Sequence, residues 1–178
     1  YNDKYEFILP EAFLEKNLFN NDFGNLDLQT NLKVYNYDTN KTTKFFVNDF
    51  IWSSKEILFD SGISSKILGN IKNINYETSN VDLYKENHTN EAHGALGLLS
   101  EIKLQKNSDN ASHFLTPKFL IRYAPGEMRQ EESGSRLDPT TAFSMNKVNN
   151  TNNFEKGLSG SFGFDYKIKK KNTNFDFS

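Results

Sequence analysis

The chain has 178 residues, a length typical of one domain, and only 36% of them are hydrophobic, with a mean hydropathy of -0.70. Such polarity is common in disordered chains, but 16 Phe, 8 Tyr and one Trp are more aromatic residues than disorder accounts for. A net charge of -2 speaks against a nucleic-acid partner, and the lack of cysteine excludes disulfides and thiolate metal sites.

Alternation of apolar and polar residues predicts β-strands, whereas helical periodicity is poor throughout. Residues 4–19 alternate up to Pro10 and then lose their phase, so the boundaries of this strand stay open. Residues 26–34 form the clearest strand. Residues 43–52 are apolar on both faces, which predicts either a bulge or a packed inner face.

Four further strands are predicted at residues 57–72, 92–105, 115–123 and 158–168. Phe175 and Phe177 begin another strand near the end of the chain. In the clearest segments one face is free of charge, whereas the opposite face carries Lys, Arg, Asp and Glu. This pattern indicates strands that are apolar on one side only.

The strands are long, and their links alternate in length. No apolar run approaches the roughly 20 residues of a membrane-spanning helix, but strands of nine or more residues are long enough to cross a bilayer at a tilt. Short links alternate with the long, polar loops 75–91 and 125–156, although the link 38–41 is short where a long one is allowed. Short turns on one side and long loops on the other are typical of outer-membrane barrels.

Together these patterns predict an all-β fold, an antiparallel up-and-down meander of about seven to eight long strands within one domain at residues 1–178. Aromatic residues occur near several strand ends. They either form girdles at a membrane interface or reflect the general preference of rings for strands. These residues are Phe23, Tyr35, Phe45, Tyr76, Tyr123 and Tyr166.

The charged faces of neighbouring strands predict cross-strand ion pairs in a polar interior. Such charges either stiffen the wall or line a hydrophilic lumen that passes something polar, and the sequence does not separate the two. The candidate lumen-lining residues are His93, Glu101, Lys103, Lys118, Arg122, Asp165 and Lys167.

We predict no enzymatic activity, no cofactor and no metal site. The three histidines, His88, His93 and His113, are scattered, and Ser133 lacks the strand-to-helix context of a nucleophile elbow. The long loop carries a charged cluster that we interpret as a solvated loop tip rather than a divalent-cation site. This cluster comprises Glu127, Arg129, Glu131, Glu132 and Arg136.

Three segments resemble one known family. They read LTPKFLIRYAPG at 115–126, RLDPTTAFSMNK at 136–147 and EKGLSGSFGFDYKI at 155–168. In this order they resemble the barrel of the LPS-assembly protein family (LptD, also OstA). Asp138, Phe143, Ser144 and Asn146 match the family's loop segment, and Lys147 replaces its usual Arg. YEFILP at 5–10 and VNDFIWSSKEILFDSG at 47–62 also resemble strands of that barrel.

The resemblance implies a segment from the middle of a much larger transmembrane β-barrel in the outer membrane of Gram-negative bacteria. The family inserts lipopolysaccharide into the outer leaflet without a covalent step. Its partners are a lipoprotein plug of the LptE type, a periplasmic Lpt bridge that docks on an N-terminal domain, and outer-membrane lipid. In that arrangement the loops 75–91 and 125–156 are extracellular, and the second folds over or into the pore. The lateral-gate residues lie outside this sequence.

Two other interpretations stay open. Eight strands can close into a small barrel on their own, as an anchor, a porin-like channel or a lipid enzyme. A soluble β-sandwich that acts as a binding module is the other. The chain starts at Tyr1 and stops at Ser178 in what reads as mid-strand, so we expect an excerpt of a longer chain whose signal peptide lies outside it.

Overall fold

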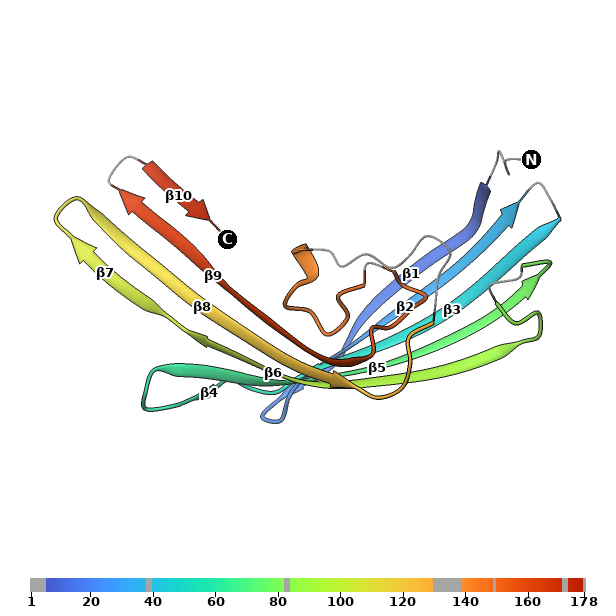
Figure 1. Cartoon of the computed structure of the whole chain (residues 1–178), viewed down its shortest axis with the longest axis horizontal. Helices are drawn as coiled ribbons and strands as arrows, with labels where there is room; N and C mark the ends of the chain where they lie inside the picture. Colours follow the sequence, from blue (N-terminus) through green and yellow to red (C-terminus); the bar gives the residue numbers. More distant parts are fainter. Residues whose placement is uncertain are drawn as a thin grey trace.

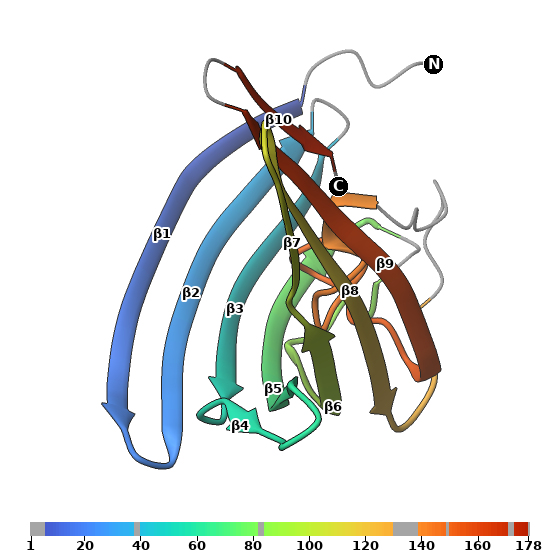
Figure 2. The ribbon, with the colours of Figure 1, turned by 90° about the vertical axis from the view of Figure 1, so that its left-hand side faces the viewer.

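The computed structural model describes residues 6–37, 40–81, 84–129, 139–148, 150–170 and 173–177. These residues form one antiparallel sheet that is curled into a half-barrel, with the ends of the loop 125–156 in its hollow (Figures 1 and 2). The expectation of an all-β meander of long strands is therefore confirmed.

Eight strands follow one another across the sheet in the order β1-β2-β3-β5-β6-β8-β9-β10, while β4 pairs with β5 and β7 pairs with β8. The strands are β1 (Glu6–Asn21), β2 (Gly24–Tyr37), β3 (Lys41–Ser53), β4 (Ile57–Leu58), β5 (Ile63–Ser79), β6 (Thr89–Ile102), β7 (Leu104–Ser108), β8 (Ala111–Ala124), β9 (Gly157–Lys170) and β10 (Thr173–Phe177). The loop before β9 contains the short 3-10 helix η1 (Pro139–Thr141).

Register keeps the two faces of the sheet chemically distinct. Phe50 on β3 lies opposite Leu28 on β2 and opposite Ile71 on β5, and Ile71 in turn lies opposite Gly94 on β6. Because side chains alternate between the faces, an unbroken register places the apolar set of every strand on one side. Around Leu28, Phe50 and Ile71 the central strands therefore share an apolar face. Uncharged polar side chains border it toward one end of the strands, namely those of Thr30, Asn48, Asn73, Asn75 and Asn90.

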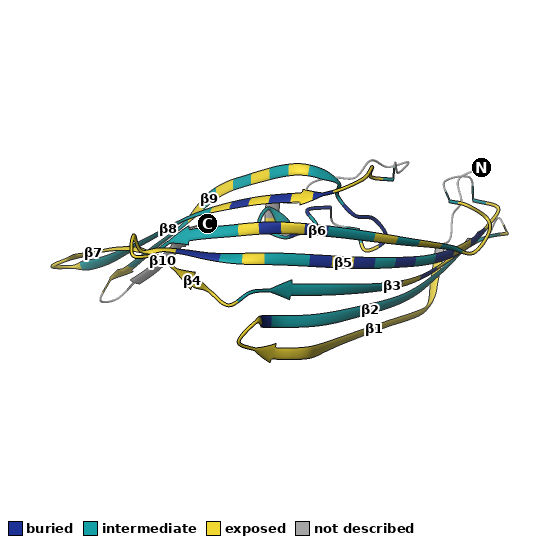
Figure 3. Cartoon of the chain, turned by 90° about the horizontal axis from the view of Figure 1, so that it is seen from below, coloured by how far each residue is buried: buried dark blue, intermediate teal, exposed yellow. Residues whose placement is uncertain are grey.

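The apolar face is the convex one, and it is exposed. The loop before β9 packs on the opposite, concave face, where Ala95 and Ala124 are buried with Met145 and Phe154 of the loop. On the convex face Ile71 is 61%, Leu98 42% and Phe162 76% exposed. Figure 3 shows the resulting alternation of exposed and covered residues along β8 and β9. Nothing in the described part of the chain covers this surface.

Two predicted strands are interrupted. The expected strand 57–72 begins as β4, turns at 60–62 and resumes as β5, where Gly62 has a φ of 82° that favours glycine. The expected strand 92–105 ends at Ile102, and β7 starts at Leu104 after Lys103. The alternation continues through both interruptions, which explains why the sequence did not reveal them.

The long loop predicted at 75–91 is shorter than expected. β5 continues to Ser79 and β6 begins at Thr89, because Tyr76 and Thr78 are buried on the concave face and extend the strand pattern. Polar composition was the wrong criterion here, since Asn73 and Asn75 stand on the strand and share a side-chain hydrogen bond.

The segment 43–52, apolar on both faces, has a packed inner face and no bulge. β3 keeps an unbroken register with β2 and with β5. Phe45 and Val47 are buried on the concave side with Ile74 and Tyr76, whereas Phe46 points to the convex side and is exposed. Packing on the concave side therefore explains the second apolar face.

The sheet has two open edges. β1 pairs with β2 across Glu6–Asn21, with register shifts between Ile8 and Glu11 and between Asn17 and Phe19 that account for its unclear phase. Within the described ranges β1 and β10 do not pair with each other, and no second sheet forms. The described residues thus form neither a small closed barrel nor a β-sandwich. They also contain no helix that is long and apolar enough to span a membrane.

Candidate functional site

The concave face and the loop that packs on it form the candidate site. Side chains of the loop approach the sheet closely at two glycines, Gly97 on β6 and Gly163 on β9. A Cβ at Gly97 would lie 2.8 Å from the sulfur of Met145, and a Cβ at Gly163 would lie 3.0 Å from the ring of Phe143. Both approaches are closer than ordinary contacts, so the loop is fitted to these two positions of the sheet.

Arg122 on β8 is bound by the loop residue Glu155. The residue Arg122 is only 1% exposed. Its Nη1 lies 3.2 Å from a carboxylate oxygen of Glu155, and its Nη2 donates to the Glu155 backbone carbonyl at 2.7 Å. A buried charge needs such a partner. The loop therefore supplies the carboxylate and carbonyl that pair a guanidinium which the sheet alone would leave unpaired.

A second ion pair runs in the reverse direction, from a loop arginine to a sheet carboxylate. Arg129 contacts Glu91 on β6, and its guanidinium lies 4.9 Å from the ring centroid of Tyr76 and 5.0 Å from that of Tyr84. Its side chain is largely buried. The prediction that Arg129 belongs to a solvated loop tip is therefore wrong.

Of the other residues in that predicted cluster, Glu127 is exposed, as expected. Glu131, Glu132 and Arg136 lie outside the described residues, as does Asp138 of the loop segment.

Phe154 is the centre of the contact between loop and sheet. It is fully buried and stacks on His93 of β6 at a centroid distance of 5.9 Å. The cationic groups of Lys72, Arg122 and Lys156 lie 5.4 to 5.8 Å from its ring. Burial and, to a smaller extent, the charge of Arg122 lower the pKa of Lys156. The loop thus places an aromatic ring among cations on the concave face.

The predicted candidates on β8 and β9 are brought together in part. Lys118 forms an ion pair with Asp165 on the neighbouring strand, as the cross-strand prediction requires. Lys167 lies opposite Phe114 on the same pair of strands. Arg122, in contrast, is paired with the loop and is buried beneath it.

The candidates on and near β6 have different surroundings. His93 lies beside Glu91, 3.4 Å from its carboxylate, under Phe154. Glu101 pairs with Lys103 at 3.2 Å, and Lys103 lies beyond the end of β6, exposed and 3.8 Å from Glu56. Lys103 is therefore not a residue of the strand face to which it was assigned.

Sequence reasoning missed several residues of the site. Lys72 on β5 is buried and lies 3.0 Å from Asp49 on β3. Lys72 belongs to the polar side of its strand, so alternation could have found it, whereas Asp49 shares its side of β3 with the apolar Val47 and Ile51. Glu155 and Phe154 lie in a loop whose sequence has no periodicity. No sequence pattern therefore predicts that this loop packs on the sheet.

Two cavities lie between the loop and the concave face. One has a volume of about 440 Å³ and the other about 450 Å³, and both are lined by Asn150 and Thr151. The first also touches β2, β3 and β5 through Gln29, Asp49 and Asn70. The second touches aromatic rings. Its ring residues are Tyr35, Phe45 and Tyr84.

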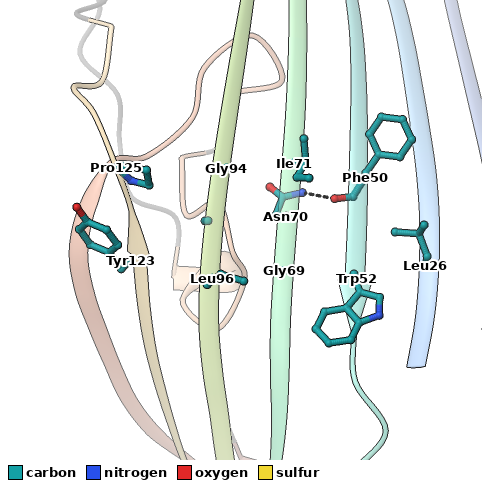
Figure 4. Close-up of a pocket in the computed structure, with 11 residues that line it drawn as sticks. Leu26, Phe50, Trp52, Gly69, Asn70, Ile71, Gly94, Leu96, Tyr123 and Pro125 are labelled. Carbon is teal, nitrogen blue, oxygen red and sulfur yellow. Dashed lines mark hydrogen bonds between the residues drawn. The ribbon is translucent and has the colours of Figure 1, made fainter. Parts of the chain in front are cut away.

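The convex face has a hollow of about 570 Å³ where β5 and β6 carry glycines (Figure 4). A Cβ at Gly69 would lie 3.3 Å from the Trp52 ring, and one at Gly94 would meet only the Asn70 carbonyl, at 3.9 Å. The described residues that line the hollow include no charged side chain. The hollow therefore suits hydrocarbon better than a polar ligand.

No group of three His, Asp or Glu residues in the described ranges could hold a metal ion. No protein-family model matches the chain, and no curated protein is significantly similar to it. The described residues define the class of architecture: an all-β half-barrel with an exposed apolar convex face and a charged concave face on which a loop is docked.

Proposed function

We propose that this chain is a wall segment of an outer-membrane lipopolysaccharide translocon, which inserts lipopolysaccharide into the outer leaflet without enzymatic chemistry. The convex face would contact lipid, and the concave face would line a hydrophilic lumen. Residues 1–178 would form part of a larger transmembrane barrel of the LPS-assembly type.

The exposed apolar convex face is the observation that carries this proposal. Side chains such as Ile71, Leu98 and Phe162 form a continuous surface over β5, β6, β8 and β9. Soluble proteins rarely expose so large an apolar patch, whereas a membrane barrel needs one around its circumference. The uncharged hollow at Gly69 and Gly94 would be filled by acyl chains.

Strand length supports a bilayer as the environment. β6, β8 and β9 have 14 residues each. At about 3.3 Å per residue and a tilt of about 45°, such a strand spans roughly 33 Å, enough for the hydrocarbon core. The strands of soluble sheets are usually only about five or six residues long.

The assignment of lipopolysaccharide rests on the sequence resemblance, whose most specific part runs from Leu115 through the loop to Tyr166. The charged concave face is compatible with a sugar-bearing headgroup that travels solvated. The lumen candidates Glu101, Lys118 and Asp165 would belong to this path, whereas His93 lies under Phe154 of the docked loop.

The proposal also places the protein among partners. The unpaired edges of β1 and β10 would be continued by further strands of the same barrel. A lipoprotein plug of the LptE type would sit within that barrel, and a periplasmic Lpt bridge would deliver lipopolysaccharide. The location is the outer membrane of a Gram-negative bacterium, with loop 125–156 on the extracellular side.

The test is depletion of the complete protein in the organism that encodes it, followed by quantification of lipopolysaccharide at the cell surface. We expect surface lipopolysaccharide to fall as the protein is lost and to return when the wild-type gene is supplied. Unchanged surface lipopolysaccharide after complete depletion would contradict the proposal.

A further inference from the structure

We propose that the cleft between the docked loop and strands β2, β3 and β5 is a binding site for a neutral saccharide chain. The two concave cavities share Asn150 and Thr151 in their linings, so a ligand that passes over these two residues would reach both. Each volume, about 440 and 450 Å³, lies within the usual range of small-molecule sites. The inference rests on the proposed function only for the source of the saccharide.

The lining suits the two kinds of surface that a sugar presents. The first cavity is lined by amides and hydroxyls, among them those of Gln29, Asn70 and Ser144, and by the apolar side chains of Ile51 and Leu68. These three polar groups donate hydrogen bonds within the protein, so toward a ligand they act through their oxygens as acceptors. Sugar hydroxyls can donate hydrogen bonds to such acceptors. A sugar ring also has apolar C–H faces, which pack against hydrophobic side chains.

The second cavity is bounded by aromatic rings. Tyr84 stands edge-on to Phe45 at a centroid distance of 5.2 Å, and Tyr35 stands edge-on to Phe45 at 6.2 Å. Thr43 and Asn152 add polar groups beside these rings. Rings with adjacent hydrogen-bonding groups can hold the apolar face and the rim of a sugar at once.

Charge argues for a neutral ligand rather than a phosphate. The described charged residues that line the two cavities are Asp49, Lys72 and Lys33. Lys72 lies 3.0 Å from Asp49, and Lys33 lies 3.1 Å from Glu11. Each cation is already neutralised, so neither cavity offers an uncompensated positive charge to an anion.

The strand face between the cavities has a buried acceptor. Asn31 lies on β2 between Gln29 of one cavity and Lys33 of the other, and its side-chain oxygen is buried without a hydrogen-bond partner within the described part of the chain. A buried acceptor without a donor is uncommon. Asn31 is absent from the linings of both cavities, so this acceptor belongs to the strand beneath the cleft and is not a ligand contact.

Binding is tested on the complete protein in detergent micelles by saturation-transfer NMR and calorimetry. Three probes are compared: maltotetraose, the dephosphorylated core oligosaccharide of lipopolysaccharide, and the same oligosaccharide with its phosphates. Binding of both neutral probes indicates a general saccharide site, whereas binding of the core oligosaccharide alone identifies the lipid-linked source. Either result supports the proposal. Binding of the phosphorylated probe alone, or of none, overturns it.

Variants locate the site. Thr151 is exposed and lines both cavities, so Thr151→Trp would place a bulky ring at the edge of each. We expect at least a tenfold loss of affinity for the neutral probe that binds. Asn110→Trp, at an exposed turn outside both cavities, is the matched control and should bind normally. Gln29→Leu gives a second, smaller variant if Thr151→Trp folds poorly.

Neutral-probe affinity that is unchanged in both Thr151→Trp and Gln29→Leu would overturn the site. The proposed function fails separately, in the depletion experiment, because that experiment measures lipopolysaccharide at the cell surface and not saccharide affinity.

Discussion

Arg122 and Glu155 join the sheet to the loop through two contacts at once, one from the carboxylate and one from the backbone carbonyl of Glu155. A reciprocal pair, Arg129 of the loop with Glu91 of the sheet, lies at the same interface. The loop is therefore held by buried charges of both signs in addition to apolar packing.

Removal of the Glu155 charge should loosen the loop. Glu155→Gln leaves the Arg122 guanidinium buried without a counter-charge, and breaking a buried pair in this way costs about 3–5 kcal/mol. We expect faster hydrogen exchange and faster proteolysis at 139–156, with the strands still protected. Glu127→Gln, at an exposed position of the same loop, is the control. Unchanged protection in Glu155→Gln would show that the pair does not hold the loop.

Gly97 and Gly163, the two positions where loop side chains approach the sheet closely, should be sensitive to added side-chain volume. Gly97→Val would force Met145 away from the sheet, because a Cβ there would lie 2.8 Å from its sulfur. Overpacking of this kind costs about 1–3 kcal/mol. Gly94→Val is the matched control on the convex face, where the nearest heavy atom would be 3.9 Å away. In limited proteolysis the loop should be cleaved faster in Gly97→Val than in Gly94→Val. Equal cleavage would count against a close fit of Met145 on Gly97.

Neighbouring leucines on β6 test which face contacts lipid. Leu98 lies on the convex face and Leu99 on the concave face, because the side chains of a strand alternate. In lipid, Leu98→Lys should cost about 2–4 kcal/mol near the bilayer midplane, and Leu99→Lys should cost less beside a hydrated lumen. The measurement is the free energy of unfolding in lipid vesicles. Equal losses would argue against a lipid-facing convex surface.

Lys156 should make loop docking depend on pH. Its pKa is lowered in the folded state by burial first and by Arg122 second. Protonation therefore favours the undocked loop, and docking should strengthen as the pH rises through the lowered pKa toward the ordinary value. In Lys156→Met we expect the loop to dock more firmly than in the wild type at neutral pH, and this pH dependence to be lost. In Lys156→Arg the charge remains, so the loop should dock no more firmly than in the wild type. Proteolysis rates at several pH values would check this.

The sheet was largely predictable because its signal is local. In β2, β8 and β9, alternation identifies the strand and its apolar face, since a two-sided environment imposes a period of two. The interruption at Gly62 was not predictable in this way, because Ser61 and Ile63 keep the alternation through the turn. Tyr35, Phe45 and Tyr76 were candidates for an interfacial girdle, but they pack on the concave face.

The site was less predictable than the sheet because it depends on contacts between distant segments. Lys118 and Asp165 could be paired from their strands, since side chains on the same face of neighbouring strands lie side by side. The partner of Arg122 could not be found this way. Glu155 is 33 residues away in a loop, and only the folded arrangement brings the two together.

The edges of the sheet have a thermodynamic consequence. β1 runs through 16 residues and, among the described strands, pairs only with β2, so its outer row of backbone amides and carbonyls needs a further strand. Water can satisfy these groups, whereas hydrocarbon cannot. In a bilayer, burial of the convex face in lipid and hydrogen bonding of the open β1 edge to a further strand therefore have to occur together. Neither step is stable without the other.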